Sequence, residues 1–125
     1  MTFQQEQDSL LAKAIADTSN SNSIVLVKNG ILIGNGEGQQ SRVIAARLAI
    51  MIAQNSKNDL DGAVAASDSF FPYPDAPEIL IDAGIDAIFT TSGSIRDKET
   101  ISLCGERGIP LYMMDDKIAR GFYHR

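Results

Sequence analysis

The sequence has no tryptophan, one cysteine and one histidine, and these scarcities exclude several classes of protein. Cys104 has no second cysteine with which to form an internal disulfide, and one cysteine with one histidine cannot make an ordinary zinc site. We therefore expect no metal. The longest apolar run, Leu48 to Ala53, is too short to cross a bilayer. The first residues lack the basic and apolar regions of a secretory signal, so we expect a cytoplasmic protein with no membrane association.

Positive charge is also scarce, since 11 basic residues face 16 acidic ones for a formal net charge of −5. Nonspecific nucleic-acid binding needs a broad basic surface, so nucleic acid is not an expected partner. A small phosphorylated molecule can still bind an acidic protein where local donors outweigh the general field. The length of 125 residues and the 44% hydrophobic content are those of one globular domain.

The first part of the chain predicts a helix followed by a hairpin. Residues 4–17 carry apolar side chains at helical spacing, and a polar run over 18–23 follows. Two short apolar strands, at 24–27 and 31–33, flank Asn29-Gly30, the strongest short hairpin signal. We divide the chain into an N-terminal helix at 1–18 and a single domain at 19–125.

The rest of the chain predicts a parallel part of the same sheet. A helix over 41–54 is apolar nearly all round, as expected for a helix pressed into a core; its large apolar residues are Val43, Ile44, Leu48, Ile50, Met51 and Ile52. Strands at 63–66, 85–90 and 109–113 alternate with helices, one opening in a capping-box pattern at Asp75 to Glu78 and one opening near Ser94. This rhythm predicts right-handed parallel connections. The expected fold is therefore α/β, with three α/β/α layers and a mixed sheet that begins with an antiparallel hairpin.

Two glycine- or serine-rich turns leave two readings open. Residues 34–42 combine three glycines with a helix start, which suits either anion binding or a tight strand-to-helix turn capped by Ser41. Glu37 would repel a pyrophosphate, so the pattern alone favours the capped turn. Residues 92–96 likewise suit helix capping or ligand contact equally well.

A stiff aromatic loop at 67–75 is the clearest candidate site in the sequence. It follows a buried strand, where open α/β sheets bind their ligands. Phe70, Phe71 and Tyr73 could fill the core or stack on a flat heterocycle, and the alternating prolines favour a site. At the end of the chain, residues 120–125 place two arginines and the only histidine beside aromatics, so we expect this tail to dock. Cys104 is expected to be a small core residue.

Taken in order, these segments resemble a known family. The series comprises Ser21-Asn-Ser, Lys28-Asn-Gly, the glycine run ending Gln-Gln-Ser-Arg42, Ser67-Asp-Ser-Phe-Phe-Pro-Tyr-Pro-Asp75, Gly93-Ser-Ile-Arg-Asp-Lys98 and a closing Arg-x-Phe-x-His. It is similar to the second half of the formyltransferase domain of AICAR transformylases, from about Ser19 onward. The resemblance implies a cytidine-deaminase-like fold without zinc. It also implies transfer of a formyl group from 10-formyltetrahydrofolate to AICAR, a phosphorylated aminoimidazole carboxamide.

The resemblance also implies which residues would bind these two ligands. Asn22, Arg42, Phe70 and Arg120 would bind the nucleotide, and Asn22 is the one position with a possible catalytic role. Val43, Asp75, Ser94 and Ile95 would line the folate side. We predict that Arg42→Ala weakens nucleotide binding with little loss of stability.

Two departures from the family limit what the resemblance implies. The family's catalytic Lys-His pair belongs to the preceding half of its domain, and His124 is not that histidine. Glu37 and Thr90 to Ser92 replace residues that in relatives are small and apolar, or proline and glycine. We therefore expect formyl transfer only with a partner that supplies the Lys-His half. The alternatives are a non-catalytic nucleotide- or folate-binding module and a degenerate half-domain. Half a domain should expose apolar surface, so we expect a homodimer or a hetero-complex.

Overall fold

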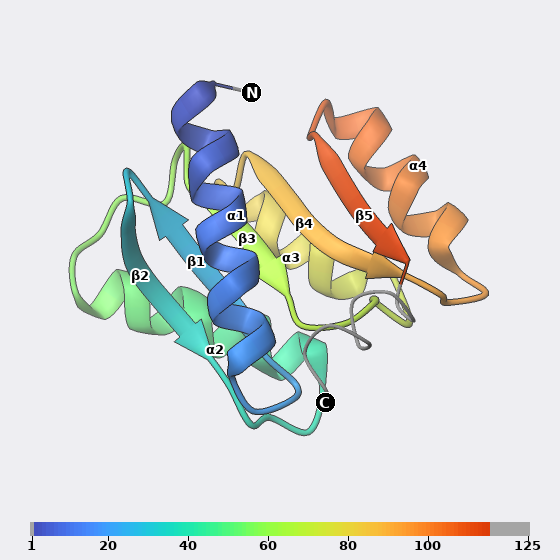
Figure 1. Ribbon diagram of the computed structural model, residues 1–125, viewed down its shortest axis with the longest axis horizontal. Helices are drawn as coiled ribbons and strands as arrows, with labels where there is room; N and C mark the ends of the chain where they lie inside the picture. Colours follow the sequence, from blue (N-terminus) through green and yellow to red (C-terminus); the bar gives the residue numbers. More distant parts are fainter. Residues whose placement is uncertain (1, 116–125) are drawn as a thin grey trace.

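The computed structural model describes residues 2–115, and within them five strands form one sheet that four helices cover (Figure 1). The helices are α1 (Phe3–Thr18), α2 (Arg42–Asn55), α3 (Asp75–Asp82) and α4 (Asp97–Arg107), and the strands are β1 (Ile24–Lys28), β2 (Ile31–Gly36), β3 (Val64–Ser67), β4 (Ala87–Ser92) and β5 (Leu111–Asp115). The predicted helices and strands are all present. The last two strands each begin two residues later than predicted, which is the usual uncertainty of element ends.

The sheet combines an antiparallel and a parallel part in the order β2-β1-β3-β4-β5. β1 pairs antiparallel with both β2 and β3, whereas β3, β4 and β5 run parallel. Asn29 and Gly30 join β1 to β2 with φ angles of 52° and 76°, as a two-residue hairpin turn requires. The predicted hairpin and the predicted parallel connections are both confirmed.

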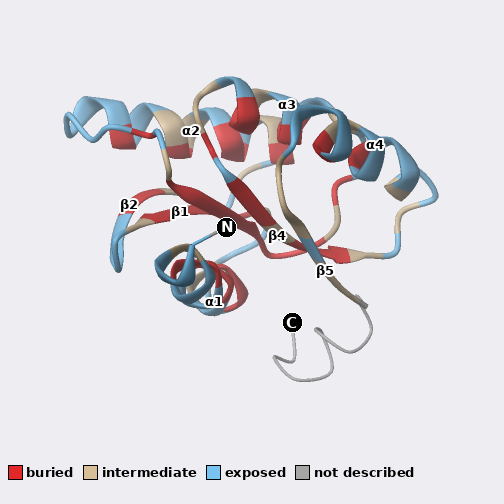
Figure 2. Cartoon of the chain, turned by 90° about the horizontal axis from the view of Figure 1, so that it is seen from above, coloured by how far each residue is buried: buried red, intermediate tan, exposed pale blue. Residues whose placement is uncertain are grey.

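The helices form two layers, one on each face of the sheet (Figure 2). α1 covers one face alone, where Ala12 and Ala16 pack on Val25, Val27 and Val64 in a small core. The other three helices cover the opposite face over a larger core, which includes Ile24, Leu26, Ala65, Leu80 and Ile88. Successive strand residues alternate between the two cores, as the pleat requires. The predicted three-layer α/β/α architecture is confirmed.

α2 packs its small side chains closest to the sheet, and the prediction of a helix pressed into the core is confirmed only for part of its surface. Ala45, Ala46, Ala49 and Ala53 are fully buried, and Val43 and Ile50 are partly buried against the core.

Three large side chains of α2 lie instead on the outer side, where Ile44, Met51 and Ile52 are 44%, 50% and 38% exposed. The helix backbone lies close to β2, because a Cβ on Gly34 or Gly36 would collide with the carbonyl oxygen of Ala49 or Ala45.

The two following helices start differently from the capping-box prediction. α3 has Pro74 at its N-cap without a side-chain cap, and the Asp75 carboxylate accepts the N–H of Ala76. α4 begins at Asp97 rather than at Ser94, because the Asp97 carboxylate accepts the N–H groups of Gly93 and Ser94 and folds residues 93–97 into a turn. Within residues 2–115, no helix is long and apolar enough to cross a membrane.

Candidate functional site

A cleft of about 500 Å³ opens where three segments meet at one end of the sheet. The strand register brings these segments together, because Ile24 at the start of β1 pairs with Gly36 on one side and with Ser67 on the other. The loop before β1, the start of α2 and the loop after β3 therefore share one edge. The lining residues are Asn22, Gln40, Ser41, Arg42, Val43, Pro72, Tyr73, Asp75 and Ala76. Four of the predicted site residues, Asn22, Arg42, Val43 and Asp75, are among them.

Asn22 is held by the loop between β2 and α2. Its backbone N–H and its side-chain Nδ2 both donate to the carbonyl oxygen of Gln39, at 3.2 and 3.0 Å. The Gln39 N–H donates back to the Asn22 carbonyl at 3.2 Å. The Gly38 N–H donates to the carbonyl of Asn20 at 2.8 Å. The two loops thus fix the position of Asn22 by backbone pairing.

Arg42 opens α2 and is almost completely enclosed. Ser41 caps the helix by accepting the Ile44 N–H at 3.1 Å, which confirms the predicted cap. The Arg42 side chain is 9% exposed, and its Nη2 lies 3.1 Å from Oδ1 of the buried Asp68. Removing one partner of such a buried pair leaves an uncompensated charge and costs about 3–5 kcal/mol. We therefore revise the expectation that Arg42→Ala leaves stability nearly unchanged.

The aromatic loop divides its side chains between the core and the cleft. Phe71 fills the core at 1% exposure, as one of the two readings of this loop predicted. Phe70 is half-buried and lies outside the cleft lining. Tyr73 lines the cleft and is 54% exposed. The Arg96 guanidinium lies 5.0 Å from the centre of the Tyr73 ring, a cation–π distance.

The remaining predicted residues lie beside the cleft or outside the described part of the chain. Ser94 and Ile95 belong to the loop between β4 and α4, and Ile95 is 99% exposed. Ser94 accepts the N–H of Arg96, the residue that covers Tyr73. The loop is thereby linked to the rim of the cleft. Arg120 and His124 lie outside the residues that the structure describes.

The sequence reasoning missed several residues of this region. Gln40, Pro72 and Ala76 line the cleft although no chemical pattern marks them. Asp68, which forms an ion pair with Arg42, belongs to the motif over residues 67–75, where the sequence pattern assigned it no role of its own. One signal was available for Asp68, since an acid directly after a fully apolar strand must find a buried partner. The partner itself could not be read from the sequence, because it lies on another element.

Two further hollows are chemically less suited to a phosphorylated ligand. One of about 210 Å³ is mostly apolar and lies between α1 and the β4–β5 strands, at Leu10, Phe89 and Tyr112. The other, of about 460 Å³, lies between α3 and α4 and carries Glu78, Glu99 and Glu106 against Lys98. Acidic side chains repel a phosphate. The cleft at Arg42 is therefore the better candidate.

Metal and thiol chemistry find no support in the described residues. Over residues 2–115, no three His, Cys, Asp or Glu side chains gather as a metal site would require. Cys104 is buried in α4, as predicted, and burial raises the pKa of its thiol. The thiol therefore stays protonated near neutral pH, and the protonated form is a poor nucleophile.

Sequence comparison relates the chain to enzymes of purine biosynthesis. The family model described as AICARFT/IMPCHase bienzyme matches residues 1–52. The bifunctional purine biosynthesis protein PurH of Bacteroides thetaiotaomicron is 44% identical over 110 residues, which are 88% of this chain and 22% of that protein. PurH of Thermotoga maritima is 40% identical over 114 residues, 91% of this chain and 25% of that protein. The chain is thus similar in sequence to the AICARFT/IMPCHase bienzymes. It spans about a fifth to a quarter of the length of these curated relatives.

Solved structures with a similar fold also match this chain. A diaminohydroxyphosphoribosylaminopyrimidine deaminase/5-amino-6-(5-phosphoribosylamino)uracil reductase from Thermotoga maritima superposes with a TM-score of 0.60 at 18% identity, over 96% of this chain and 38% of that one. RibD of Acinetobacter baumannii gives a TM-score of 0.60 at 17% identity, over 94% and 36%. At such identities the likeness concerns the fold alone. The fold is cytidine-deaminase-like, as the family resemblance implied.

Proposed function

We propose that this chain provides the ligand-binding half of a formyltransferase of purine biosynthesis. Its substrates would be AICAR and 10-formyltetrahydrofolate, and a complementary polypeptide segment would supply the Lys-His pair. The observation that carries the proposal is the meeting of Asn22, Arg42, Val43 and Asp75 along one cleft. These residues come from three separate segments, and only the fold brings them together. Similarity to the bifunctional purine biosynthesis protein PurH supports a role in purine biosynthesis.

The nucleotide would lie at the amino end of α2. Arg42 carries a positive charge there, and the first N–H groups of the helix add a favourable dipole for an anion. Asn22 offers an amide to the polar edge of the heterocycle, and it is held in place by Gln39. The ring of Tyr73 lines the same cleft and offers a flat apolar surface. Phe70 and Arg120 remain part of the proposed nucleotide site on the resemblance alone.

The folate would lie on the α3 side of the cleft. Val43 supplies an apolar surface, and the Asp75 carboxylate can accept from pterin N–H groups. Ser94 and Ile95 lie on the neighbouring loop, where the exposed Ile95 side chain is available for apolar contact. The two ligands would thus meet where the part of the cleft at Asn22 and Arg42 adjoins the part at Val43 and Asp75.

The chemistry explains why a second segment is needed. A bond forms between the AICAR amine and the formyl carbon, the bond from that carbon to the folate nitrogen breaks, and the amine proton passes to the freed nitrogen. A positioned acid or base contributes about 10²–10⁴-fold to such proton transfers. The lining residues of the cleft include no lysine or histidine. Asn22 can orient a substrate but does not accept a proton at neutral pH.

Association with another chain is part of the proposal. Ile44, Met51 and Ile52 form an exposed apolar stripe along the outer side of α2, beginning one residue after Val43 of the cleft. Spacings of 7 and 8 residues place them on one helix face. A homodimer, or a hetero-complex with the complementary segment, would cover this stripe. Light scattering that gives a clean monomer at high concentration, with and without a complementary segment, would exclude both.

A non-catalytic binding module is the second candidate function, favoured by the lack of a lysine or histidine among the lining residues. Two experiments separate the possibilities. Calorimetry with AICAR and with a folate shows whether the cleft binds either ligand; binding of neither would support a degenerate half-domain and end the proposal. A formyl-transfer assay is then run on the chain alone and with the Lys-His half of a PurH protein. Activity only in the mixture supports the transferase, whereas binding without activity in both supports the module.

A further inference from the structure

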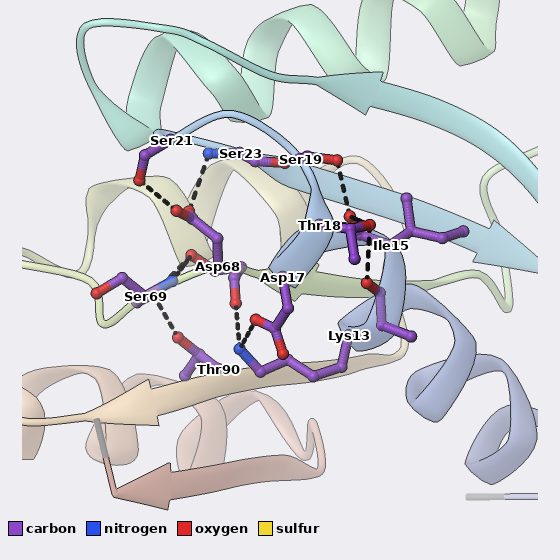
Figure 3. A network of polar contacts seen from close by, with 12 residues as sticks. Lys13, Ile15, Asp17, Thr18, Ser19, Ser21, Ser23, Asp68, Ser69 and Thr90 are labelled. Carbon is purple, nitrogen blue, oxygen red and sulfur yellow. Dashed lines mark hydrogen bonds and ion pairs between the residues drawn. The ribbon is translucent and has the colours of Figure 1, made fainter. Parts of the chain in front are cut away.

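One buried carboxylate, that of Asp68, ties together two segments that carry cleft residues. The Asp68 side chain is fully enclosed directly after β3. Its Oδ1 accepts the N–H of Ser23 at 2.9 Å and lies 3.1 Å from Nη2 of Arg42, and its Oδ2 accepts the hydroxyl of Ser21. Figure 3 shows the hydroxyl of Ser21 and the backbone nitrogen of Ser23 directed at this carboxylate. A buried charge is tolerated when it is paired and hydrogen-bonded, as here.

These contacts surround Asn22 in the chain. Ser21 and Ser23 are its two neighbours, so Asp68 holds the loop on both sides of Asn22. Backbone pairing reinforces the tie, because the Asp68 N–H donates to the Ser23 carbonyl at 3.2 Å. The same carboxylate faces Arg42 on α2. The relative position of two cleft residues from different elements therefore depends on a third residue that does not line the cleft.

We infer that Asp68 is a positioning residue, which acts on the nucleotide through Asn22 and Arg42 without touching it. The inference rests on the proposed function and adds to it the residue that holds the two nucleotide-binding side chains in place.

The competing explanation is that Asp68 only balances the charge of Arg42. The two explanations predict changes of opposite sign in AICAR affinity when the Asp68 charge is removed. Removing a negative charge beside Arg42 makes the cleft more positive by one unit. By Coulomb's law alone, this change strengthens the binding of a phosphate. Positioning has the opposite consequence, because Arg42 and the Asn22 loop lose their common anchor. The direction of the change in affinity therefore decides between them.

The first test is the affinity of the Asp68→Asn variant for AICAR, measured by calorimetry at a temperature where the protein is folded. Asparagine keeps the size of the side chain and removes its charge. Asp68→Asn weakens the hydrogen bonds that the charged carboxylate accepts, and such bonds are stronger than those between neutral groups. We therefore expect the affinity for AICAR to fall about tenfold to a hundredfold. Unchanged or tighter binding would overturn the inference. If this variant does not fold, Ser21→Ala removes only the hydroxyl contact to Asp68, and we expect about fivefold weaker binding.

The matched control is Asp8→Asn. Asp8 is also a buried aspartate, and it accepts the N–H groups of Asn29 and Gly30 at 2.8 Å each. These residues form the turn between β1 and β2, at the opposite end of β1 from the Asn22 loop. Its neutralisation should lower stability while leaving AICAR affinity within about twofold, since destabilisation of a protein that remains folded changes binding little. An equal loss of affinity in the control would show that both variants act through general destabilisation, and would overturn the specific role of Asp68.

A second test needs no ligand. Hydrogen exchange is followed at the backbone N–H groups of Asn22 and Gln39, neither of which is bonded to Asp68 in the described contacts. If Asp68 anchors the loop, Asp68→Asn should speed exchange at both by about tenfold relative to the N–H groups of β1. Faster exchange at Ser23 alone would overturn the inference. If the wild-type chain fails to bind AICAR, the proposed function falls, and the exchange result still decides whether Asp68 anchors the loop.

Discussion

The contact between α2 and β2 leads to a sharp prediction for Gly36→Ala. An added Cβ would meet the carbonyl oxygen of Ala45 and lie 3.0 Å and 3.1 Å from the carbonyl carbon and Cα of the same residue. All three are backbone atoms of a helix, so no side chain can rotate away. Relief requires the helix to move off the strand.

Two opposing free energies set the size of this effect. Alanine restricts the unfolded chain more than glycine does, which favours folding by about 0.4–1 kcal/mol. Overpacking a tight contact costs about 1–3 kcal/mol. The clash involves backbone, so we take the upper part of that range and expect a net loss of about 1–2 kcal/mol in the free energy of unfolding. Since α2 begins at Arg42, its displacement should also weaken AICAR binding.

Urea denaturation followed by circular dichroism measures this loss, and Gly105→Ala is the matched control. Gly105 lies inside α4 with nothing within 4 Å of an added Cβ. The same substitution there should stabilise the protein by about 0.5–1 kcal/mol, the difference in helix propensity. The two variants should therefore shift the midpoint in opposite directions. A Gly36→Ala protein as stable as wild type would refute the argument that closeness to the helix demands glycine.

Three other predictions concern the cleft, the outer stripe and the thiol. Arg42→Ala should weaken AICAR binding and also lower the free energy of unfolding by about 3–5 kcal/mol, because the buried Asp68 loses its cation; denaturation that matches wild type would contradict this. Met51→Glu should leave the far-ultraviolet spectrum unchanged while reducing the apparent mass in light scattering, since Met51 is half exposed on α2. Burial raises the pKa of the Cys104 thiol, so the folded state favours the protonated thiol. The resulting stabilisation is complete below the ordinary thiol pKa and is lost as the pH rises through the pKa of the folded state. Cys104→Ala should flatten that alkaline decline in urea midpoints, and an unchanged decline would assign it to another group.

The sequence was sufficient for features whose cause is local. Asn29-Gly30 predicted the hairpin because a two-residue turn needs positive φ at both positions. The alternation of apolar runs with helix starts predicted the parallel strands. The placement of α2 was predicted only in part, since it depends on how closely the helix backbone approaches Gly34 and Gly36. Ile50 packs against the core, whereas Ile44 and Ile52 lie on the exposed side, and hydrophobicity alone does not distinguish these isoleucines.

The candidate cleft also depends on contacts between distant segments, which the sequence pattern does not reveal. The family resemblance, rather than composition or spacing, assigned Asn22, Arg42, Val43 and Asp75. The fold places them together through strand pairing. The partners of Asp68 could not be read from the sequence, because Ser21, Ser23 and Arg42 lie on two other segments.

The pairing of β1 with both β2 and β3 also governs when the cleft can form during folding. The parallel half of the sheet, residues 64–115, is built from neighbouring units and involves short chain closures. The β1–β3 pairing instead joins residues about 40 positions apart, and such distant pairings are slow to form. When only the parallel half of the sheet has formed, Tyr73 and Asp75 are in place, but Asn22 and Arg42 are not yet positioned beside them. Ligand affinity should therefore appear only with the last long-range step, so a bound nucleotide reports that the entire sheet is complete.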